Sequence, residues 1–182
     1  MDNGLGGDFI VAYDGSFNPQ KTTHKMEDLV SGRTYRFKVH AVDINGAGEE
    51  SSISEILACV SPSIMEVPTL QSVDETSFTV AWVEPKSVGG CPITSYALFR
   101  DDGAGSDINI SIDPGTVGSS ISQLSHTATL GSSETGKSFR VVAQASNVIG
   151  SVSSSSITIV LADKPAAPSP APTADLDLTN TR

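Results

Sequence analysis

Hydrophobic and polar side chains alternate in three stretches of the chain, residues 34–42 (TYRFKVHAV), 77–82 (SFTVAW) and 138–146 (SFRVVAQAS). Residues two apart lie on one face of a strand, so each stretch can direct an apolar face to a core and a polar face to water. No stretch of ten residues keeps a helical apolar spacing without an interrupting Gly or Pro. The pattern therefore predicts half-buried antiparallel strands and almost no helix. The expected core faces are Phe78, Val80 and Trp82; Tyr35, Phe37, Val39 and Ala41; and Phe139, Val141, Ala143 and Ala145, while Arg36, Lys38 and His40 face water.

The later half of the chain repeats the earlier half at a shift of 104 positions. This shift places Tyr35 on Phe139 and Arg36 on Arg140 without a gap. The period is that of one sandwich domain rather than that of a short solenoid unit. Upstream the register breaks, and there Tyr13–Gly15 aligns with Arg100–Gly103. The other matched positions are Gly32 and Gly136, Ala41 and Ala145, Gly46 and Gly150, and Leu57-Ala58 and Leu161-Ala162.

Two Asp-Gly pairs, Asp14-Gly15 and Asp102-Gly103, follow strand-like segments. A type I′ turn needs positive φ at both central residues, which Gly adopts freely and Asp tolerates. We therefore expect each pair to close a tight hairpin, after residues 8–13 (DFIVAY) in the first copy and after residues 92–100 (PITSYALFR) in the second. On this interpretation DFIVAY is the third strand of a sandwich, and the first copy lacks the first two strands with their core tryptophan.

The second copy, residues 68–163, resembles a fibronectin type III domain through a combination of residues rather than through any single one. The first copy carries LVSGRTY (29–35), which is similar to the corner motif of that family. The resemblance implies that the Tyr35 hydroxyl bonds back to the backbone where the chain crosses between sheets. Phe139 has no hydroxyl, so a looser corner is expected in the second copy. The residues that carry the likeness are Trp82, Gly89-Gly90, Ile93, Tyr96, Gly136 and the turn Asn147–Gly150.

The resemblance implies an all-β chain of tandem immunoglobulin-like, antiparallel β-sandwiches, the first of them incomplete. We expect a partial domain with the later strands only at 1–62 and a full domain at 66–164. Residues 165–182 are expected to form a Pro-rich linker and the first strand of a third repeat. The segment GGCPITSYALFRDDG also resembles repeats of large multi-domain proteins of single-celled eukaryotes. The structural core is expected at Tyr35, Trp82, Tyr96 and Phe139.

A half-sandwich would expose an apolar face and a strand edge. Two interpretations of such a unit stay open. In the first, the chain is a stretch of a longer array. In the second, the tail of one molecule completes the head of the next by strand addition, which gives head-to-tail self-association.

The charge balance narrows the range of partners. The chain has 11 Lys and Arg against 21 Asp and Glu, a formal net charge of −10. This charge repels phosphate backbones, so no nucleic-acid partner is expected. The sequence contains no run of about 18 apolar residues, so we expect no membrane insertion by this segment. Protein partners are the expected class.

The sequence lacks the common motifs of catalytic and metal-binding sites. The histidines are far apart in the sequence and are expected on strand surfaces, and neither a G-x-S-x-G elbow nor a phosphate-binding loop occurs. Three aspartates at 101, 102 and 107 offer oxygens to calcium, but the EF-hand spacing is absent and a hairpin turn explains Asp102. We therefore expect no enzyme, no cofactor and no metal site. The histidines are His24, His40 and His126.

Two further features concern covalent chemistry. The resemblance implies that the end of one repeat approaches the loop after the second strand of the next, which would bring Cys59 near Cys91. A disulfide between the repeats then requires Cα atoms within about 7 Å; the alternative is two free thiols, with Cys91 partly buried. Asn109-Ile110-Ser111 is a glycosylation sequon, which matters only in a secreted chain.

These observations favour a non-catalytic structural or protein-binding module of a larger repeat protein, acting in adhesion, as a spacer or as a scaffold. The parent protein is expected to be secreted or surface-associated, outside the cell or on a membrane. Two alternatives stay open: an accessory array attached to an enzyme domain, and an intracellular cytoskeletal or ciliary scaffold. Free cysteines and an unglycosylated Asn109 would favour the intracellular scaffold.

Overall fold

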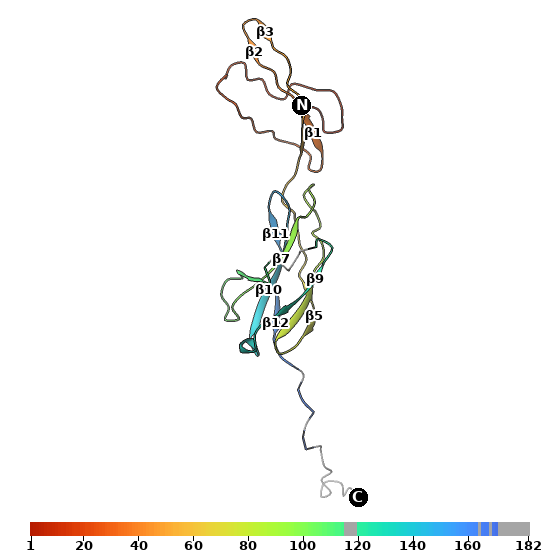
Figure 1. Ribbon diagram of the computed structural model, residues 1–182, viewed down its shortest axis with the longest axis vertical. Coiled ribbons are helices and arrows are strands. Elements are labelled where there is room, and N and C mark those ends of the chain that lie inside the picture. Colours follow the sequence, from red (N-terminus) through yellow and green to blue (C-terminus); the bar gives the residue numbers. More distant parts are fainter. Residues whose placement is uncertain (115–119, 164, 168, 171–182) are drawn as a thin grey trace, which may run out of the picture.

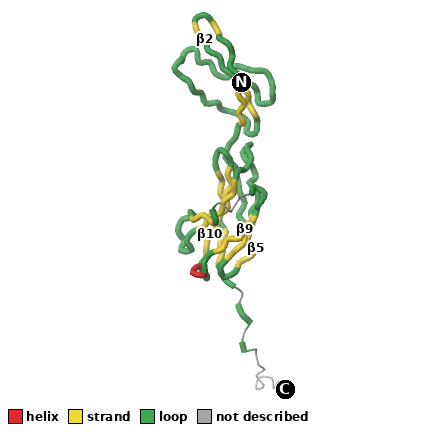
Figure 2. The backbone as a smooth tube through the Cα atoms, viewed as in Figure 1, coloured by secondary structure: helices red, strands yellow, loops and turns green. Residues whose placement is uncertain are grey.

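The computed structural model of the chain describes residues 1–114, 120–163, 165–167, 169 and 170. Two units follow one another along an elongated molecule, an N-terminal unit of short strands and a second, fuller sandwich (Figure 1). Among the described residues, helix is confined to one 3-10 turn, η1 (Ser132–Glu134), and the predicted all-β fold is confirmed (Figure 2). No helix in these residues has the length and hydrophobicity to cross a membrane. The predicted first strand of a third repeat falls largely in 171–182, outside the described residues.

Two antiparallel sheets form the second unit. The first sheet has the order β5–β6–β9, and the second has the order β11–β10–β7–β8, with β12 also paired to β10. The long strand β10 (Ser138–Ser146) binds β7 along one edge and both β11 and β12 along the other. The other bounds are β5 (Thr69–Val73), β6 (Ser77–Ala81), β7 (Ser95–Arg100), β8 (Ile110–Ile112), β9 (Ser125–Thr129), β11 (Ser151–Ser153) and β12 (Ile157–Val160).

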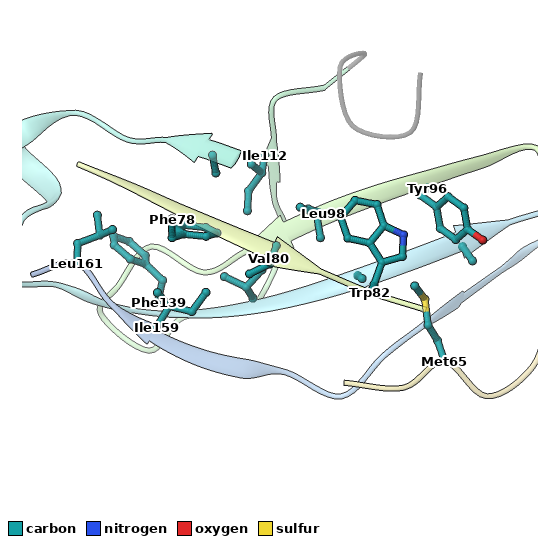
Figure 3. Packing of buried hydrophobic residues seen from close by; sticks show 14 residues of the cluster. Met65, Phe78, Val80, Trp82, Tyr96, Leu98, Ile112, Phe139, Ile159 and Leu161 are labelled. Atoms are coloured by element: carbon teal, nitrogen blue, oxygen red, sulfur yellow. The ribbon is translucent and has the colours of Figure 1, made fainter. Parts of the chain in front are cut away.

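The core of the second unit lies between these sheets and uses the alternating positions (Figure 3). Phe78 of β6 and Phe139 of β10 have no exposed surface. Burial of such a side chain stabilises the fold by roughly 1.5–3 kcal/mol. The Trp82 ring, directly after β6, packs at a tilt on Tyr96, with ring centroids 5.8 Å apart. The rest of the buried cluster is Met65, Val80, Leu98, Ile112, Ala128, Val141, Ala143, Ala145, Ile159 and Leu161.

The N-terminal unit has two short strand pairs and a corner. β1 (Thr34–Phe37) pairs with β4 (Ser54–Leu57), and β2 (Val42–Asp43) pairs with β3 (Gly46–Ala47). The Tyr35 hydroxyl accepts a hydrogen bond from the Val30 N–H at 2.9 Å, which is the contact that the LVSGRTY motif implies. Within residues 1–60, Tyr35 is the only buried hydrophobic side chain.

The apolar alternation in residues 34–42 does not produce a core face, contrary to the prediction. Val39 is 72% exposed and Ala41 is also exposed, whereas their counterparts Ala143 and Ala145 are fully buried. In the second unit the sheet that contains β6 covers this face of β10. Within residues 1–60 no second sheet of this kind is formed. The alternation therefore specifies which side chains share a face, but a facing sheet is needed to bury them.

The two predicted Asp-Gly hairpins are wrong. Residues 8–13 form no strand, and the turn that follows runs from Gly15 to Asn18, whose N–H donates to the Gly15 carbonyl at 2.8 Å. Asp102-Gly103 lies in a longer connection, residues 101–109, between β7 and β8. Gly103 has a φ of +77°, but Asp102 is not among the residues with positive φ. A type I′ turn needs both, so the pair cannot form one.

Candidate functional site

The junction between the two units is the candidate functional site. The linker after β4 runs antiparallel to the loop between β6 and β7, with an isolated β-bridge between Ser63 and Ser87. The Ser63 N–H donates to the Ser87 carbonyl at 2.9 Å, and the Val60 N–H donates to the Gly89 carbonyl at 2.9 Å. These backbone bonds tie the linker to the second repeat along its length.

Glycines let the two backbones approach at this junction. A Cβ on Gly90 would overlap the backbone of Gly32, and a Cβ on Gly89 would overlap the Val60 carbonyl. Both residues also have positive φ, +87° and +75°, which glycine adopts without strain. The Gly-Gly pair is recognisable in the sequence, but its role as the contact with the first repeat is visible only in the fold.

Asn147 is 6% exposed, and its side chain forms hydrogen bonds that connect the end of the first repeat to the second. Its Nδ2 donates to the carbonyl of Val60 at 2.8 Å and to the carbonyl of Val88 at 2.9 Å. Its Oδ1 accepts hydrogen bonds from the N–H groups of Ile149 and Gly150. One buried amide therefore joins the linker, the β6–β7 loop and the β10–β11 turn, a role that sequence reasoning missed.

The structure pairs Cys59 with Cys91 at the same junction, with their Cα atoms 5.6 Å apart. This separation lies within the range that a disulfide spans. Cys59 is half-buried and Cys91 is 6% exposed. The family's topology, not the spacing of the two cysteines in the sequence, pointed to this pair.

A carboxylate–arginine pair anchors the loop after β7. Asp101 is 1% exposed, and its Oδ2 lies 2.8 Å from Nε of Arg140 on β10. Its Oδ1 accepts hydrogen bonds from the N–H groups of Arg140 at 3.1 Å and Gly103 at 3.2 Å. The Arg140 guanidinium also donates to the Ser106 carbonyl. Asp101 is therefore a buried structural anion and not a solvated hairpin residue.

The first repeat carries the same pair. Asp2 Oδ2 lies 2.8 Å from Nε of Arg36, and its Oδ1 accepts from the N–H groups of Arg36 at 2.9 Å and Gly4 at 3.1 Å. MDNGLGGD (1–8) is thus the counterpart of RDDGAGSD (100–107), a shift of 99 that is readable from the spaced glycines. The alignment of Tyr13–Gly15 with Arg100–Gly103 was wrong. DFIVAY corresponds to the segment containing β8 and is not the third strand.

Both anchoring carboxyls have a lowered pKa. Hydrogen bonds from the backbone and then the side chain of Arg36 lower the pKa of Asp2 from 3.8 to about 2, against the opposing effect of burial. For Asp101, burial is the largest influence and raises the pKa, but hydrogen bonds from Arg140 and Gly103 together outweigh it and the pKa is lowered. Both carboxyls therefore stay ionised down to a pH below the ordinary value.

The other predicted residues do not converge on one site. Asn109 is exposed just before β8. His126 is not a surface residue as predicted, since it is buried with Nε2 2.8 Å from Oδ2 of Asp113. His24 stacks on Tyr13 with ring centroids 4.0 Å apart. Within the part of the chain that the structure describes, no three His, Cys, Asp or Glu residues gather in a way that could hold a metal ion.

Comparison with known proteins gives partial matches, and no family model matches the chain. Myomesin-2 of Homo sapiens is 33% identical over 100 residues, which are 51% of this chain and 7% of myomesin-2. Fibronectin type-III domain-containing protein 3A of Mus musculus is 26% identical over 98 residues, 53% of this chain and 8% of the relative. The crystal structure of titin domains A168–A170 covers 64% of this chain and 39% of the titin chain, at 17% identity and a TM-score of 0.48. The chain thus spans less than a tenth of the length of either relative.

The two facing antiparallel sheets, the internal repeat and the tyrosine corner define a tandem β-sandwich repeat protein. Myomesin-2 and fibronectin type-III domain-containing protein 3A are each similar to about half of this chain. The comparisons therefore support fibronectin type III domain repeats as the class to which this chain is similar.

Proposed function

We propose that this chain is a non-catalytic structural and protein-binding module of a larger secreted or surface-associated repeat protein, and that it holds its two repeats at a set angle as a spacer. The observation that carries the proposal is the junction. Backbone hydrogen bonds, the Gly32–Gly90 approach and the Asn147 amide all connect the first repeat to the second. Similarity to fibronectin type III proteins supports a non-catalytic module. The proposed division into domains 1–62 and 66–164 puts Ser63, which pairs with Ser87, between the two repeats.

A spacer of this kind requires that the two repeats reorient together. The substitution Gly90→Ala places a Cβ inside van der Waals contact with Gly32 and should open the junction. We expect one common rotational correlation time for both repeats in the wild type and two shorter, different times in G90A, measured by 15N NMR relaxation. The matched control is Gly105→Ala, because Gly105 also has positive φ, +91°, but nothing lies within 4 Å of its Cβ position.

Independent correlation times for the two repeats in the wild-type chain would contradict the spacer. Equal loosening of the junction by G105A would show that backbone strain, and not the contact with Gly32, causes the effect. Gly105 lies in the connection between β7 and β8, away from the junction. In the G105A variant, the backbone amides of the junction residues should therefore keep their wild-type chemical shifts.

A secreted or surface location predicts a modified Asn109. The side chain is exposed just before the edge strand β8, and the sequon residue Ser111 is exposed as well. We expect the chain to gain one N-glycan when it is directed through the secretory pathway of a eukaryotic host, and to lose it in Asn109→Gln. Mass spectrometry before and after glycosidase treatment measures this, with Ser111→Ala as the control that retains Asn109. An unmodified Asn109 in the secreted chain would favour the intracellular scaffold instead.

A further inference from the structure

The Cys59–Cys91 disulfide joins the end of the first repeat to a loop of the second repeat. Cys59 follows β4 of the first repeat by two positions, and Cys91 lies in the loop between β6 and β7 of the second. The two residues are 32 positions apart in sequence but their Cα atoms are 5.6 Å apart. The linker, β5 and β6 therefore lie inside the loop that a disulfide closes.

We infer that this disulfide is a mechanical bypass of the junction: tension along the chain passes from Cys59 directly to Cys91, and the linker, β5 and β6 carry no load. Covalent bonds hold against forces that break hydrogen bonds, so the bonds Val60–Gly89 and Ser63–Ser87 are shielded inside the closed loop. β6 is also shielded, and it contributes Phe78 and Val80 to the core. The spacer thus keeps its junction geometry under load as long as the disulfide is intact.

The residues that form this joint are not repeated at the equivalent positions of the other repeat. Tyr35 pairs with Ile56 and Phe139 pairs with Ile159, so Ala162 stands at the position of Cys59 and the end of the second repeat lacks the cysteine. The shift of 104 places Asp43 at the position of Asn147. A carboxylate cannot donate the hydrogen bonds that the Asn147 amide makes to Val60 and Val88. Both parts of the joint are therefore specific to the contact between these two repeats.

Reduction removes the bypass. A dithiol of low molecular weight can attack at the half-buried Cys59, whereas Cys91 is 6% exposed. The reaction breaks the Sγ–Sγ bond, delivers two electrons and two protons to the cysteines, and converts the dithiol into its cyclic disulfide. Tension then runs through the linker into β5.

The test is to pull the full chain by handles at its two ends in a force spectrometer, with and without the dithiol. The 32-residue separation corresponds to about 110 Å of extended chain at roughly 3.5 Å per residue. We expect complete unfolding of the oxidised chain to release about 110 Å less contour length than that of the reduced chain. The double variant Cys59→Ser, Cys91→Ser should match the reduced wild type and should not respond to the dithiol.

Equal contour length with and without the dithiol would overturn the bypass, as would two alkylatable thiols in the unreduced protein. If the double variant fails to fold, the comparison of oxidised with reduced wild type still decides the question. The inference extends the proposed spacer role, but the pulling experiment reports the load path alone. Failure of the spacer would instead appear as independent tumbling of the repeats.

Discussion

Residues 66–165, expressed alone, are expected to unfold in one cooperative transition, whereas residues 1–64 are expected to show little β-sandwich circular dichroism. The second repeat buries a continuous cluster between two sheets, with Phe78, Leu98 and Phe139 fully enclosed. The N-terminal unit buries Tyr35 but leaves Val39 and its neighbours exposed. Two isolated strand pairs are marginal in water at best, since a stable sheet needs more strands or a packed face.

Urea titration followed by circular dichroism and fluorescence of Trp82 measures the first transition, and coincident curves are the mark of two-state unfolding. The matched measurement on residues 1–64 uses far-UV circular dichroism and amide dispersion in NMR. A stable monomeric N-terminal fragment with dispersed amides would contradict the conclusion that the face of β1 needs a second sheet.

The second large effect is expected at the buried carboxylate. Asp101→Ala removes the acceptor of the N–H groups of Gly103 and Arg140 and of the Arg140 Nε–H. Breaking a buried pair costs about 3–5 kcal/mol, but the Arg140 side chain is 41% exposed and stays partly solvated. We therefore expect a loss of about 2–3 kcal/mol in the free energy of unfolding at pH 7, measured by urea denaturation.

Asp102→Ala is the matched control, because Asp102 lies in the same loop, is exposed, and accepts only local N–H bonds from Ala104 and Ser106. It should leave the free energy of unfolding nearly unchanged, because water can replace the carboxylate as acceptor. The difference between wild type and D101A should be complete above pH 3.8 and should shrink as the pH falls through the lowered pKa of Asp101, because protonation removes the same charge. Equal losses for D101A and D102A, or a difference that persists unchanged at pH 2, would contradict the role of the buried anion.

Local rules succeeded where the repeat was complete. The alternation in residues 77–82 and 138–146 predicted the inward faces of β6 and β10, because strand geometry alternates side chains regardless of the surroundings. In the incomplete first repeat, the family resemblance implied a hydrogen-bonded hydroxyl at the corner, and Tyr35 makes that bond to Val30.

Local rules failed at the turns. An Asp-Gly pair is a signal for a tight hairpin only when two strands flank it closely. In the second repeat the residue directly before this pair is Asp101. It binds Arg140, which lies 39 positions away in the sequence. That distant bond, rather than the Asp102-Gly103 dipeptide, sets the path of the loop after β7.

The sequence by itself determined the strand periodicity and the internal repeat, because each depends on residues that are near neighbours or on a comparison of the chain with itself. The corner was implied by the resemblance to fibronectin type III domains. Only the tertiary structure decided which apolar faces are buried, that Asp101 is a buried anion, and that Gly90 meets Gly32 and Cys91 meets Cys59. These outcomes depend on contacts between residues far apart in the chain. Such contacts form only when the sheets pack and the second repeat stacks on the first.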